Sequence, residues 1–349
     1  MSAVDVIVGT GGIGTGKIYR LEGNEPLGRN ETRFGHLLDQ KDFCKLHIVF
    51  HYIAVLLSGI APNVSILPVG GVGDDAEGEE VLRLVSEAGM TSEYIRTIPG
   101  TPTLTALCYQ FPDGSGGNIT ERESASSKIS PEDIGRVSVR LKGKRVLTAA
   151  LPEVPLETRV HLLKAGRKLG AVNAASFVSG EMEQVKELNI IPDVDILALN
   201  IDEAAALIST NLSGVTGPDL ALEEWVDSCF RYVSKRNSTV KCIITAGKQG
   251  FYGYHQGQMA HFPPLDVSLT NSAGAGDALL AGVIIGETLG LPFFPSAGAS
   301  TLHLANCLAA QSVEAPDTIN FHVSIDSFRS FCGSHGHSEI EILFQKSSS

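Results

Sequence analysis

Residues 271–277 combine glycines and one acid in a pattern suited to binding an anion and moving a proton. They read NSAGAGD, and the apolar helical segment ALLAGVIIGETLG follows directly. Backbone N–H groups at a helix start converge on an anion, and the helix dipole favours negative charge there. The pattern predicts an anion hole formed by the N–H groups of Gly274, Ala275 and Gly276, with Asp277 as general base. A tight turn, with Asp277 as a charge at the helix N-terminus, explains the same residue pattern.

The N-terminal region contains two weaker glycine patterns. Gly9, Gly11 and Gly14 have the GxGxxG spacing of a dinucleotide site, and Gly11, Gly16 and Lys17 approach a P-loop. Both motifs require a helix immediately afterwards, whereas residues 15–28 contain three glycines and a proline. An NAD-dependent dehydrogenase is therefore only a third alternative, and these glycines are interpreted as a sharp turn near a ligand.

The elements that must position these residues alternate along the chain. Apolar, β-branched runs at residues 64–69, 145–150, 171–175, 195–200 and 240–247 are separated by segments with helical spacing. Strands that alternate with helices predict an α/β fold with a central, mostly parallel sheet between two layers of helices. Residues 12–40 and 98–125 break this alternation, and we expect them to form a small β lid.

Composition narrows the function classes. The 349 residues include 27 Lys+Arg against 39 Asp+Glu, which gives a formal charge of −12. This balance argues against a nucleic-acid groove or an anionic membrane surface as partner. The six cysteines form no CxxC pair, and no basic signal region begins the chain. We expect a cytoplasmic protein, and we interpret the uncharged stretch 46–73 as a buried helix, a turn and a strand.

Five motifs in register resemble the ribokinase, or PfkB, family of carbohydrate kinases. Residues 271–284 fit its C-terminal signature, in which Asn at the first position is a tolerated variant. Residues 200–203 resemble its Asn-x-x-Glu motif, and residues 245–247 its Thr-x-Gly strand end. Residues 71–78 resemble its Gly-Asp-Asp block, and residues 303–313 its helix beside the nucleotide base. The resemblance implies a ribokinase-like three-layer sandwich and an alcohol phosphotransferase.

The resemblance also implies the cofactors and their residues. ATP and Mg²⁺ are expected, with Glu203 organising the hydrated metal together with Asn200. Thr245, Gly247 and Asn306 are expected beside the nucleotide, and Asn271 at the signature loop. A helix N-cap at residues 200–203 and a hydrogen-bonded core position for Asn306 are the alternatives. Many members of this family bind a monovalent cation beside the loop; the neutral Asn271 leaves that open.

The N-terminal region departs from the family pattern. The acid and the Gly-Gly-x-x-x-Asn block that serve the sugar hydroxyls in the family are missing around residues 11–17 and 39–50. By position, Gly12 and Asp74 are candidates for contacting the substrate. Lys17, in a segment that also carries three arginines, is a candidate for an anionic acceptor, with a solvated lid surface as its alternative.

The sequence thus predicts an ATP-dependent kinase that phosphorylates a hydroxyl group of a sugar or sugar-like molecule. A nucleoside kinase and a sugar-phosphate kinase remain open within this class, and an inactive nucleotide-binding regulator outside it. We expect one kinase domain over residues 1–335 and a flexible tail over residues 336–349. The unpaired edges of the lid and the family's habit favour a homodimer through the lid.

Overall fold

The central element is a large, mostly parallel sheet. The computed structural model describes residues 4–113, 116–209 and 219–345. Within this part of the chain, nine strands pair in the order β13-β12-β11-β10-β9-β8-β1-β4-β5. They are parallel except at β12 and β13, which extend one edge as antiparallel strands. The bounds are β1 Val6–Thr10, β4 Ser65–Gly73, β5 Ile95–Ile98, β8 Val146–Ala150, β9 Val172–Ser176, β10 Ile196–Asn200, β11 Lys241–Thr245, β12 Phe251–His255 and β13 Gln258–Phe262.

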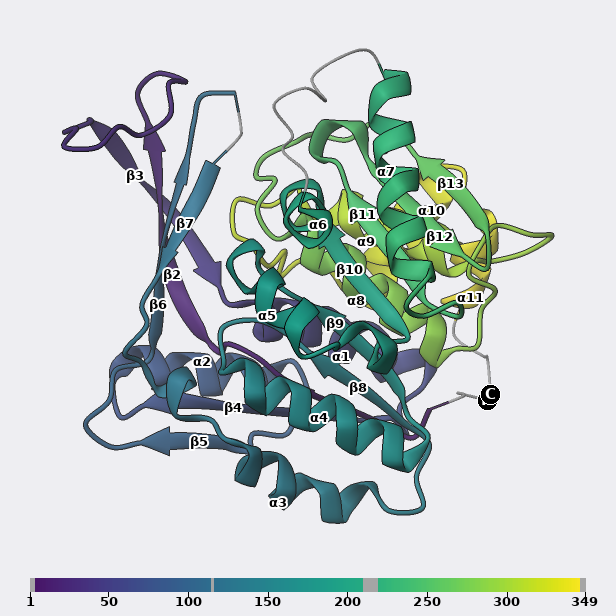
Figure 1. The fold of residues 1–349 in the computed structure, drawn as a ribbon, viewed down its shortest axis with the longest axis horizontal. Helices are drawn as coiled ribbons and strands as arrows, with labels where there is room; N and C mark the ends of the chain where they lie inside the picture. The colour runs from purple at the N-terminus through teal and green to yellow at the C-terminus, as the bar shows by residue number, and fades with distance from the viewer. Residues whose placement is uncertain (1–3, 114–115, 210–218, 346–349) are drawn as a thin grey trace.

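Helices cover both faces of this sheet (Figure 1). One face packs against α1, α2, α8, α9, α10 and α11, and the other against α3 to α7. Their bounds are α1 Lys45–Ile60, α2 Ala76–Glu87, α3 Pro131–Leu141, α4 Leu156–Leu169, α5 Met182–Glu187, α6 Ile201–Ile208, α7 Asp219–Ser234, α8 Ala275–Thr288, α9 Thr301–Ser312, α10 Ile325–Ser334 and α11 Ser338–Leu343. Short 3₁₀ segments lie at Ala125–Lys128, Ser179–Glu181, Ile191–Asp193 and Gly247–Gln249. The expected three-layer α/β arrangement is confirmed.

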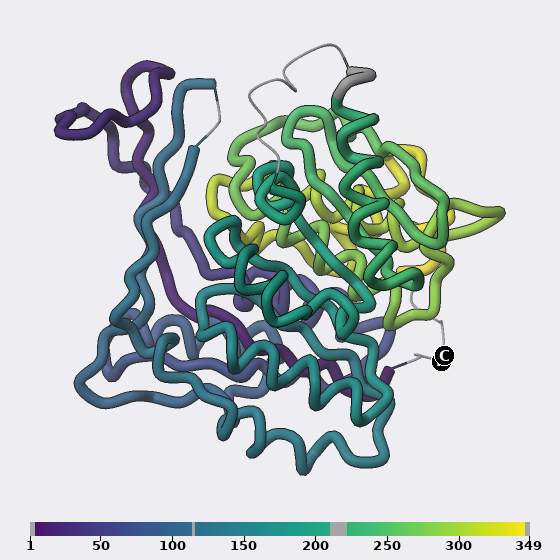
Figure 2. Tube along the Cα trace, in the orientation of Figure 1, coloured from purple at the N-terminus to yellow at the C-terminus, as the bar shows by residue number. Residues whose placement is uncertain are grey.

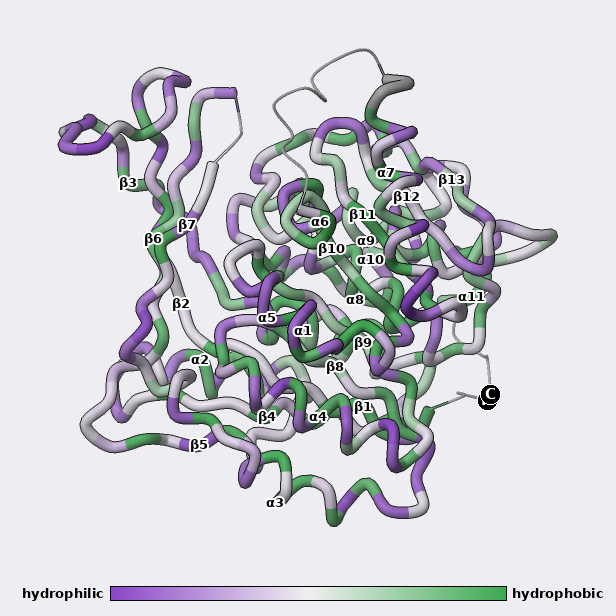
Figure 3. The backbone as a smooth tube through the Cα atoms, viewed as in Figure 1, coloured by the Kyte–Doolittle hydropathy of each residue, from purple (hydrophilic) through white to green (hydrophobic). Residues whose placement is uncertain are grey.

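Buried apolar strands explain why this sheet lies at the centre. All five residues of β1 and of β8 are buried, as is typical of parallel strands that are covered on both faces. Figure 3 shows the same contrast, with the central strands largely hydrophobic and the outer ends of the lid hydrophilic. Because parallel strands end on one edge, the loops after β10 and β11 come together there.

A second, smaller sheet projects from the main body. Its described strands are β2 Gly14–Leu21, β3 Gly35–Phe43, β6 Leu104–Gln110 and β7 Gly116–Thr120, in the order β3-β2-β6-β7. They come from the two stretches that interrupt the βα alternation, with β3 continuing to Phe43. These stretches lie far apart in sequence but run side by side through the parallel pairing of β2 with β6 (Figure 2). We call this sheet the lid.

The C-terminal region differs from the expected flexible tail. Residues 338–343 form α11, and Ile340 and Phe344 are fully buried. Phe344 packs edge-on against Phe328 of α10, with ring centroids 5.0 Å apart. Ile340 and Phe344 lie four residues apart and so face the same side, where they hold the segment against the body. Residues 346–349 lie outside the described residues.

The uncharged stretch 46–73 forms a helix and a strand of the body. Leu46 and Tyr52 of α1 are fully buried in the core, and the strand that follows is β4. In the described chain, no helix has the length and hydropathy that a membrane span would require.

Candidate active site

A cavity of about 790 Å³ lies at the edge where β10 and β11 end. Thr245 and Gly247 line it from the end of β11, Gly276 from the start of α8, and Asn306 from α9. Its volume falls in the range of small-molecule sites, about 300–1,000 Å³. The structure therefore brings together in one cavity residues from three of the sequence motifs.

The signature loop turns sharply into α8. Gly274 is the N-cap residue, with φ of 83°, and a Cβ atom there would collide with the Thr318 backbone oxygen. A positive φ and this close approach both require glycine. Ala275 and Gly276 begin the helix. The Ala275 N–H donates to the Ser272 backbone oxygen just before the helix (3.3 Å), and the Gly276 N–H lies among the first-turn donors without an intrahelical partner. The predicted anion hole therefore has the backbone geometry of a helix start.

Gly276 is a glycine for a different reason. A Cβ atom added to it would meet only Thr245 Cγ2, at 3.9 Å, among the described atoms within 4 Å. Its φ is not in the left-handed region. Packing and backbone strain therefore do not demand glycine here, whereas a ligand approaching the helix start would.

The side chain of Asn271 holds the loop in place. Its Nδ2 donates to the Pro316 backbone oxygen (2.7 Å), and its Oδ1 accepts from the Ala273 N–H (3.0 Å). Oδ1 also accepts from Gln110 Nε2 of the lid strand β6 (2.8 Å). The residue is 3% exposed. Asn271 thus links the lid to the signature loop.

Asp277 lies in the first turn of α8 beside the lysine that begins α1. Lys45 Nζ is 3.7 Å from Asp277 Oδ1, and the two side chains are 27% and 17% exposed. Burial raises the pKa of Asp277, while the charge of Lys45 acts in the opposite direction. The pKa of Lys45 is raised, mainly by Asp277, so Lys45 stays protonated. This pair combines a partly accessible carboxyl group with a fixed ammonium group.

Glu153 adds a second carboxyl group next to Lys45. Its Oε2 accepts the backbone N–H of Lys45 (3.0 Å), and its own φ is 77°. A positive φ is strained for glutamate, and such strain clusters at functional sites. Burial raises the pKa of Glu153 to about 7. A Cβ atom on Gly12 would collide with this carboxyl group, so Gly12 makes room for it.

Asn200 and Glu203 form a reciprocal capping box at the start of α6. The Asn200 N–H donates to Glu203 Oε2, and the Glu203 N–H to Asn200 Oδ1, both at 2.8 Å. This is the helix N-cap that the sequence offered as an alternative. Glu203 is 6% exposed; burial raises its pKa, and Lys45 and Asp277 act on it electrostatically. The box therefore also directs Glu203 toward the Lys45–Asp277 pair.

Asp42 approaches the same group from β3 of the lid. Its Oδ2 accepts a hydrogen bond from the Cys108 thiol (2.9 Å). Burial raises the pKa of Asp42, and the charge of Asp277 raises it further. The charge of Asp42 in turn raises the pKa of Glu153. Glu153, Glu203 and Asp277 therefore surround Lys45, and Asp42 adds a fourth carboxyl group that interacts with Asp277 and Glu153.

The other substrate candidates lie elsewhere. Lys17 of β2 is exposed and pairs with Lys41, whereas its neighbour Gly16 pairs with Asp42. Since successive residues of a strand point to opposite faces, Lys17 lies on the face of the lid away from Asp42. Asp74 is exposed in the turn before α2, where its Oδ1 accepts the Gly100 N–H (3.0 Å). The structure does not bring either residue to the carboxyl group cluster.

Asn306 has a structural contact in addition to its place in the cavity. Its Nδ2 donates to the Pro263 backbone oxygen (3.1 Å), and the residue is 7% exposed. Asn306 therefore lies beside the cavity and is also hydrogen-bonded in the core, which is the alternative that the sequence offered.

Sequence reasoning missed Lys45, Glu153 and Asp42. Lys45 and Asp42 lie in the stretch 39–50, which matches no motif, and Glu153 follows β8 in an unremarkable loop. No local pattern marks them because their relation to Asp277 depends on the pairing of distant elements. The contact of α1 with α8 and the attachment of the lid create that relation.

Comparisons with known proteins agree with this geometry. Residues 53–324 match the model of the pfkB family carbohydrate kinases. A deoxyribokinase of Salmonella typhi is 25% identical over 220 residues, which cover 62% of this chain and 67% of the relative. A fructokinase of Klebsiella pneumoniae is 26% identical over 251 residues, covering 71% and 79%.

Solved structures with the same fold are similar over nearly the whole chain. A nucleoside kinase of Burkholderia thailandensis in complex with inosine superposes with a TM-score of 0.70 at 16% identity, covering 95% of this chain and 99% of that one. A ribokinase of Cryptococcus neoformans in complex with ADP has a TM-score of 0.70 at 16% identity, covering 93% and 98%. At this identity the likeness shows the ribokinase-like fold.

Proposed function

The chain belongs to the pfkB family of carbohydrate kinases, and we propose that it phosphorylates an uncharged, sugar-like acceptor whose hydroxyl group lies beside Asp277. An ATP-dependent kinase of a sugar-like hydroxyl group is the function that the family and its relatives support. The expected family, enzyme class and activity are thereby confirmed. The identity of the acceptor and the roles of individual residues are the proposal.

The observation that carries the proposal is the position of Asp277. It lies in the first turn of α8, whose first residues line a cavity large enough for a nucleotide, and Lys45 lies beside it. Phosphoryl transfer needs little covalent help, so the protein mainly aligns the two substrates and stabilises negative charge. Asp277 accepts the proton of the acceptor hydroxyl group, and the N–H groups of residues 274–276 stabilise the transferring phosphoryl group.

Lys45 has two roles in this scheme. Its ammonium group stabilises the ionised form of Asp277, which must be deprotonated to accept a proton. The same charge, next to the start of α8, can also stabilise negative charge that spreads over the phosphoryl oxygens in the transition state. Lys45 is the first residue of α1, and its backbone N–H donates to Glu153 Oε2, which fixes the backbone from which the side chain extends.

The 790 Å³ cavity fits ATP use by this family. We place the phosphates at the start of α8, where Gly276 leaves room, and the base between the end of β11 and α9. Thr245 and Gly247 then border the nucleotide on one side and Asn306 on the other. The lid reaches the same cavity, because Lys248 Nζ donates to the Asp113 backbone oxygen (2.8 Å) at the lid end.

Mg²⁺ fits the acidic side of this site. Magnesium prefers oxygen ligands and keeps much of its water, so it needs few protein contacts. Glu203, which is buried and directed toward Asp277, is the residue that would hold hydrated Mg²⁺, with Asn200 fixing its orientation. When bound, the ion supplies charge neutralisation for the phosphates. The amide of Asn271 is engaged in the loop and the lid, which favours activity without an added monovalent cation.

The charges around Asp277 favour an uncharged acceptor. Glu153, Glu203 and Asp277 interact with the Lys45 ammonium group, and Asp42 of the lid adds a fourth carboxyl group that interacts with Asp277 and Glu153. Carboxyl groups bind sugar hydroxyl groups well but repel a phosphate. Lys17 lies on the opposite face of the lid, where it cannot offset this repulsion. We therefore propose a free sugar or nucleoside as substrate and not a sugar phosphate.

The test is ADP release from Mg·ATP across matched pairs of acceptors, each sugar beside its phosphate and each nucleoside beside its nucleotide. We expect turnover with a neutral member and not with its phosphorylated partner, and loss of that turnover in Asp277→Asn. Turnover with only the phosphorylated members would refute the uncharged acceptor. An ATP-binding protein without turnover on any acceptor would favour the regulatory alternative.

The lid also offers a surface for a second copy of the chain. It carries exposed apolar residues on its strands, among them Leu37, Leu107 and Ile119, and its edge strands β3 and β7 are unpaired on one side within the described chain. Such edges and apolar surface favour association. We propose a homodimer through the lid, which sedimentation of the wild-type protein and of Ile119→Lys would test.

A further inference from the structure

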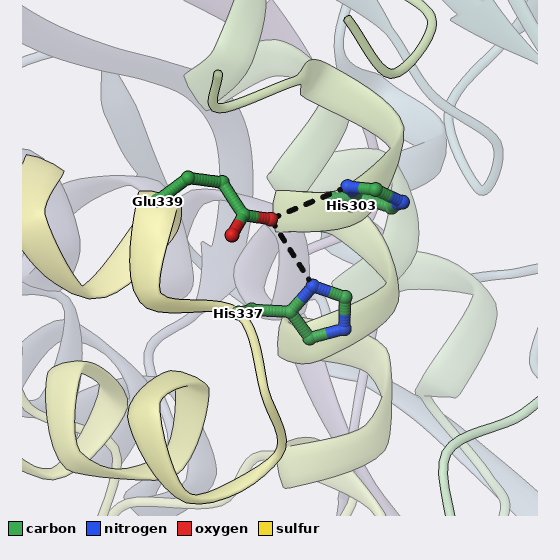
Figure 4. A group of neighbouring side chains, drawn as sticks. All are labelled: His303, His337 and Glu339. Atoms are coloured by element: carbon green, nitrogen blue, oxygen red, sulfur yellow. Dashed lines mark hydrogen bonds and ion pairs between the residues drawn. The ribbon is translucent and has the colours of Figure 1, made fainter. Parts of the chain in front are cut away.

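Two histidines and a glutamate converge where the start of α9 meets the start of α11, and none of the three lines the active-site cavity. His303 lies in the first turn of α9, His337 caps the start of α11, and Glu339 lies in the first turn of α11. Figure 4 shows Nδ1 of both imidazole rings directed at the same carboxylate oxygen of Glu339. The catalytic scheme uses none of these three side chains.

The spacing of the three donor atoms matches a metal site. Glu339 Oε1 lies 3.4 Å from His303 Nδ1 and 3.3 Å from His337 Nδ1, and all three ligand atoms lie within 4.8 Å of one another. A tetrahedral Zn²⁺ ion with bonds of about 2.0–2.1 Å holds its donors roughly 3.3–3.4 Å apart. The two distances from Glu339 Oε1 to the histidine nitrogens match this spacing.

His303 Nδ1 is buried, and its contact is the ion-pair distance of 3.4 Å to Glu339 Oε1; among the described residues it has no hydrogen bond. A buried imidazole nitrogen without a hydrogen bond calls for an explanation. An ion shared by the three side chains would satisfy this atom.

The surroundings suit a metal ligand set. Cys307 lies one turn along α9 from His303 and interacts electrostatically with His337. His303, His337 and Glu339 are 28%, 15% and 28% exposed, so an ion can enter from solvent and keep a water ligand.

The geometry points to a binding site for a divalent transition-metal ion of the Zn²⁺ type at His303, His337 and Glu339, with water as the fourth ligand. Imidazole and carboxylate donors favour such an ion over Mg²⁺, which prefers six oxygen ligands. Because two ligands lie on α11 and one on α9, the bound ion would fasten the C-terminal helix to the body. The same helix α9 lines the active-site cavity through Asn306, one turn from His303. The role of the ion is thus structural.

The full-length protein is first treated with a chelator and then titrated with Zn²⁺ in the absence of nucleotide. Calorimetry measures the binding, and metal analysis of the dialysed protein gives the number of ions per chain. We expect one Zn²⁺ per chain and an increase in the midpoint of thermal unfolding. His303→Asn and Glu339→Gln each remove one donor and should weaken binding more than about 100-fold, beyond the effect of losing an outer-shell partner.

The matched control is His161→Asn, which changes an exposed histidine of α4. It should bind zinc like the wild type. Cobalt in place of zinc provides a spectroscopic readout, because four-coordinate Co²⁺ absorbs strongly in the visible range. Glu339→Gln keeps the test decisive if His303→Asn fails to fold. Absence of stoichiometric binding, equal binding in Glu339→Gln, or the same stabilisation by Mg²⁺ would overturn the inference.

Discussion

Lys45 Nζ lies 3.7 Å from Asp277 Oδ1, which joins the start of α1 to the start of α8. The two helices pack against each other on one face of the sheet, so each delivers its first turn to the same place. The carboxyl group that we propose as general base thereby acquires a positive neighbour. The pair also lies where the lid and the loop after β8 contribute Asp42 and Glu153.

Asp277→Asn should lower kcat by about 10²–10⁴ and leave ATP binding nearly unchanged, because the amide cannot accept the proton of the acceptor. The measurement is steady-state ADP release together with calorimetric titration of ATP. Asp326→Asn, which changes an acid in the first turn of α10, is the control and should keep full activity. Retained turnover in Asp277→Asn would exclude the residue as the general base.

Lys45→Met should lower kcat more than it raises the KM for ATP, because the lost charge acts on Asp277 and on the transition state. A loss of roughly 10²-fold is expected, comparable to removing one oxyanion-hole donor. Lys45→Arg should recover part of it. Lys41→Met is the control, since Lys41 is exposed on the lid and pairs with Glu80. An unchanged kcat in Lys45→Met would limit Lys45 to a structural role.

Gly276→Ala should fold normally but bind ATP more weakly and turn over more slowly. Its new methyl group meets only Thr245 Cγ2 at 3.9 Å in the described structure, yet it projects where we place the phosphates. Gly274→Ala is the matched comparison, and it should destabilise the protein because of its φ of 83° and the Thr318 oxygen. Thermal unfolding and ATP titration of both variants separate the two effects. Normal ATP binding by Gly276→Ala would move the phosphates elsewhere.

Glu153 should make folding stability depend on pH. Its pKa is raised from 4.5 to about 7 in the folded state, so the folded protein holds this proton more tightly than the unfolded chain. The resulting stabilisation is complete below pH 4.5 and is lost as the pH rises through about 7. Relative to the wild type, Glu153→Gln should therefore gain on the order of 1–3 kcal/mol across this interval.

Urea unfolding of the wild type and of Glu153→Gln at several pH values between 4.5 and 7 measures this difference. Glu157→Gln, which changes an exposed acid at the start of α4 in the same way, is the matched control. The comparison isolates Glu153 because burial raises the pKa of Asp42, Glu203 and Asp277 in both proteins. A difference that does not change with pH would mean that Glu153 is ionised in the folded state.

Local patterns were sufficient to predict the framework. Runs such as 145–150 and 195–200 are apolar on both faces, which only a covered sheet can satisfy, and they are β8 and β10. The loop 271–277 and the box formed by Asn200 and Glu203 are also local, because a helix start is decided by a few consecutive residues. The fold, the enzyme class and the start of α8 beside the cavity could therefore be predicted from the sequence.

The flexible tail shows where a local argument failed. The polar, serine-rich end of the sequence favours a flexible tail. Ile340 and Phe344 are too few apolar residues to predict a helix by periodicity. Their burial depends on the surface that α10 presents, and in particular on Phe328. Short helices form mainly through such tertiary packing.

By itself, the sequence determined which segments become strands and helices, and where a helix begins with glycines and an acid. Only the tertiary structure decided which side chains stand opposite that acid. Lys45, Glu153 and Asp42 meet Asp277 through the packing of α1 on α8, the loop after β8 and the lid. His303, His337 and Glu339 likewise meet because α11 folds back onto α9. Secondary structure follows from neighbours along the chain, whereas a site with several charges forms from elements that are distant in sequence and become neighbours only on folding.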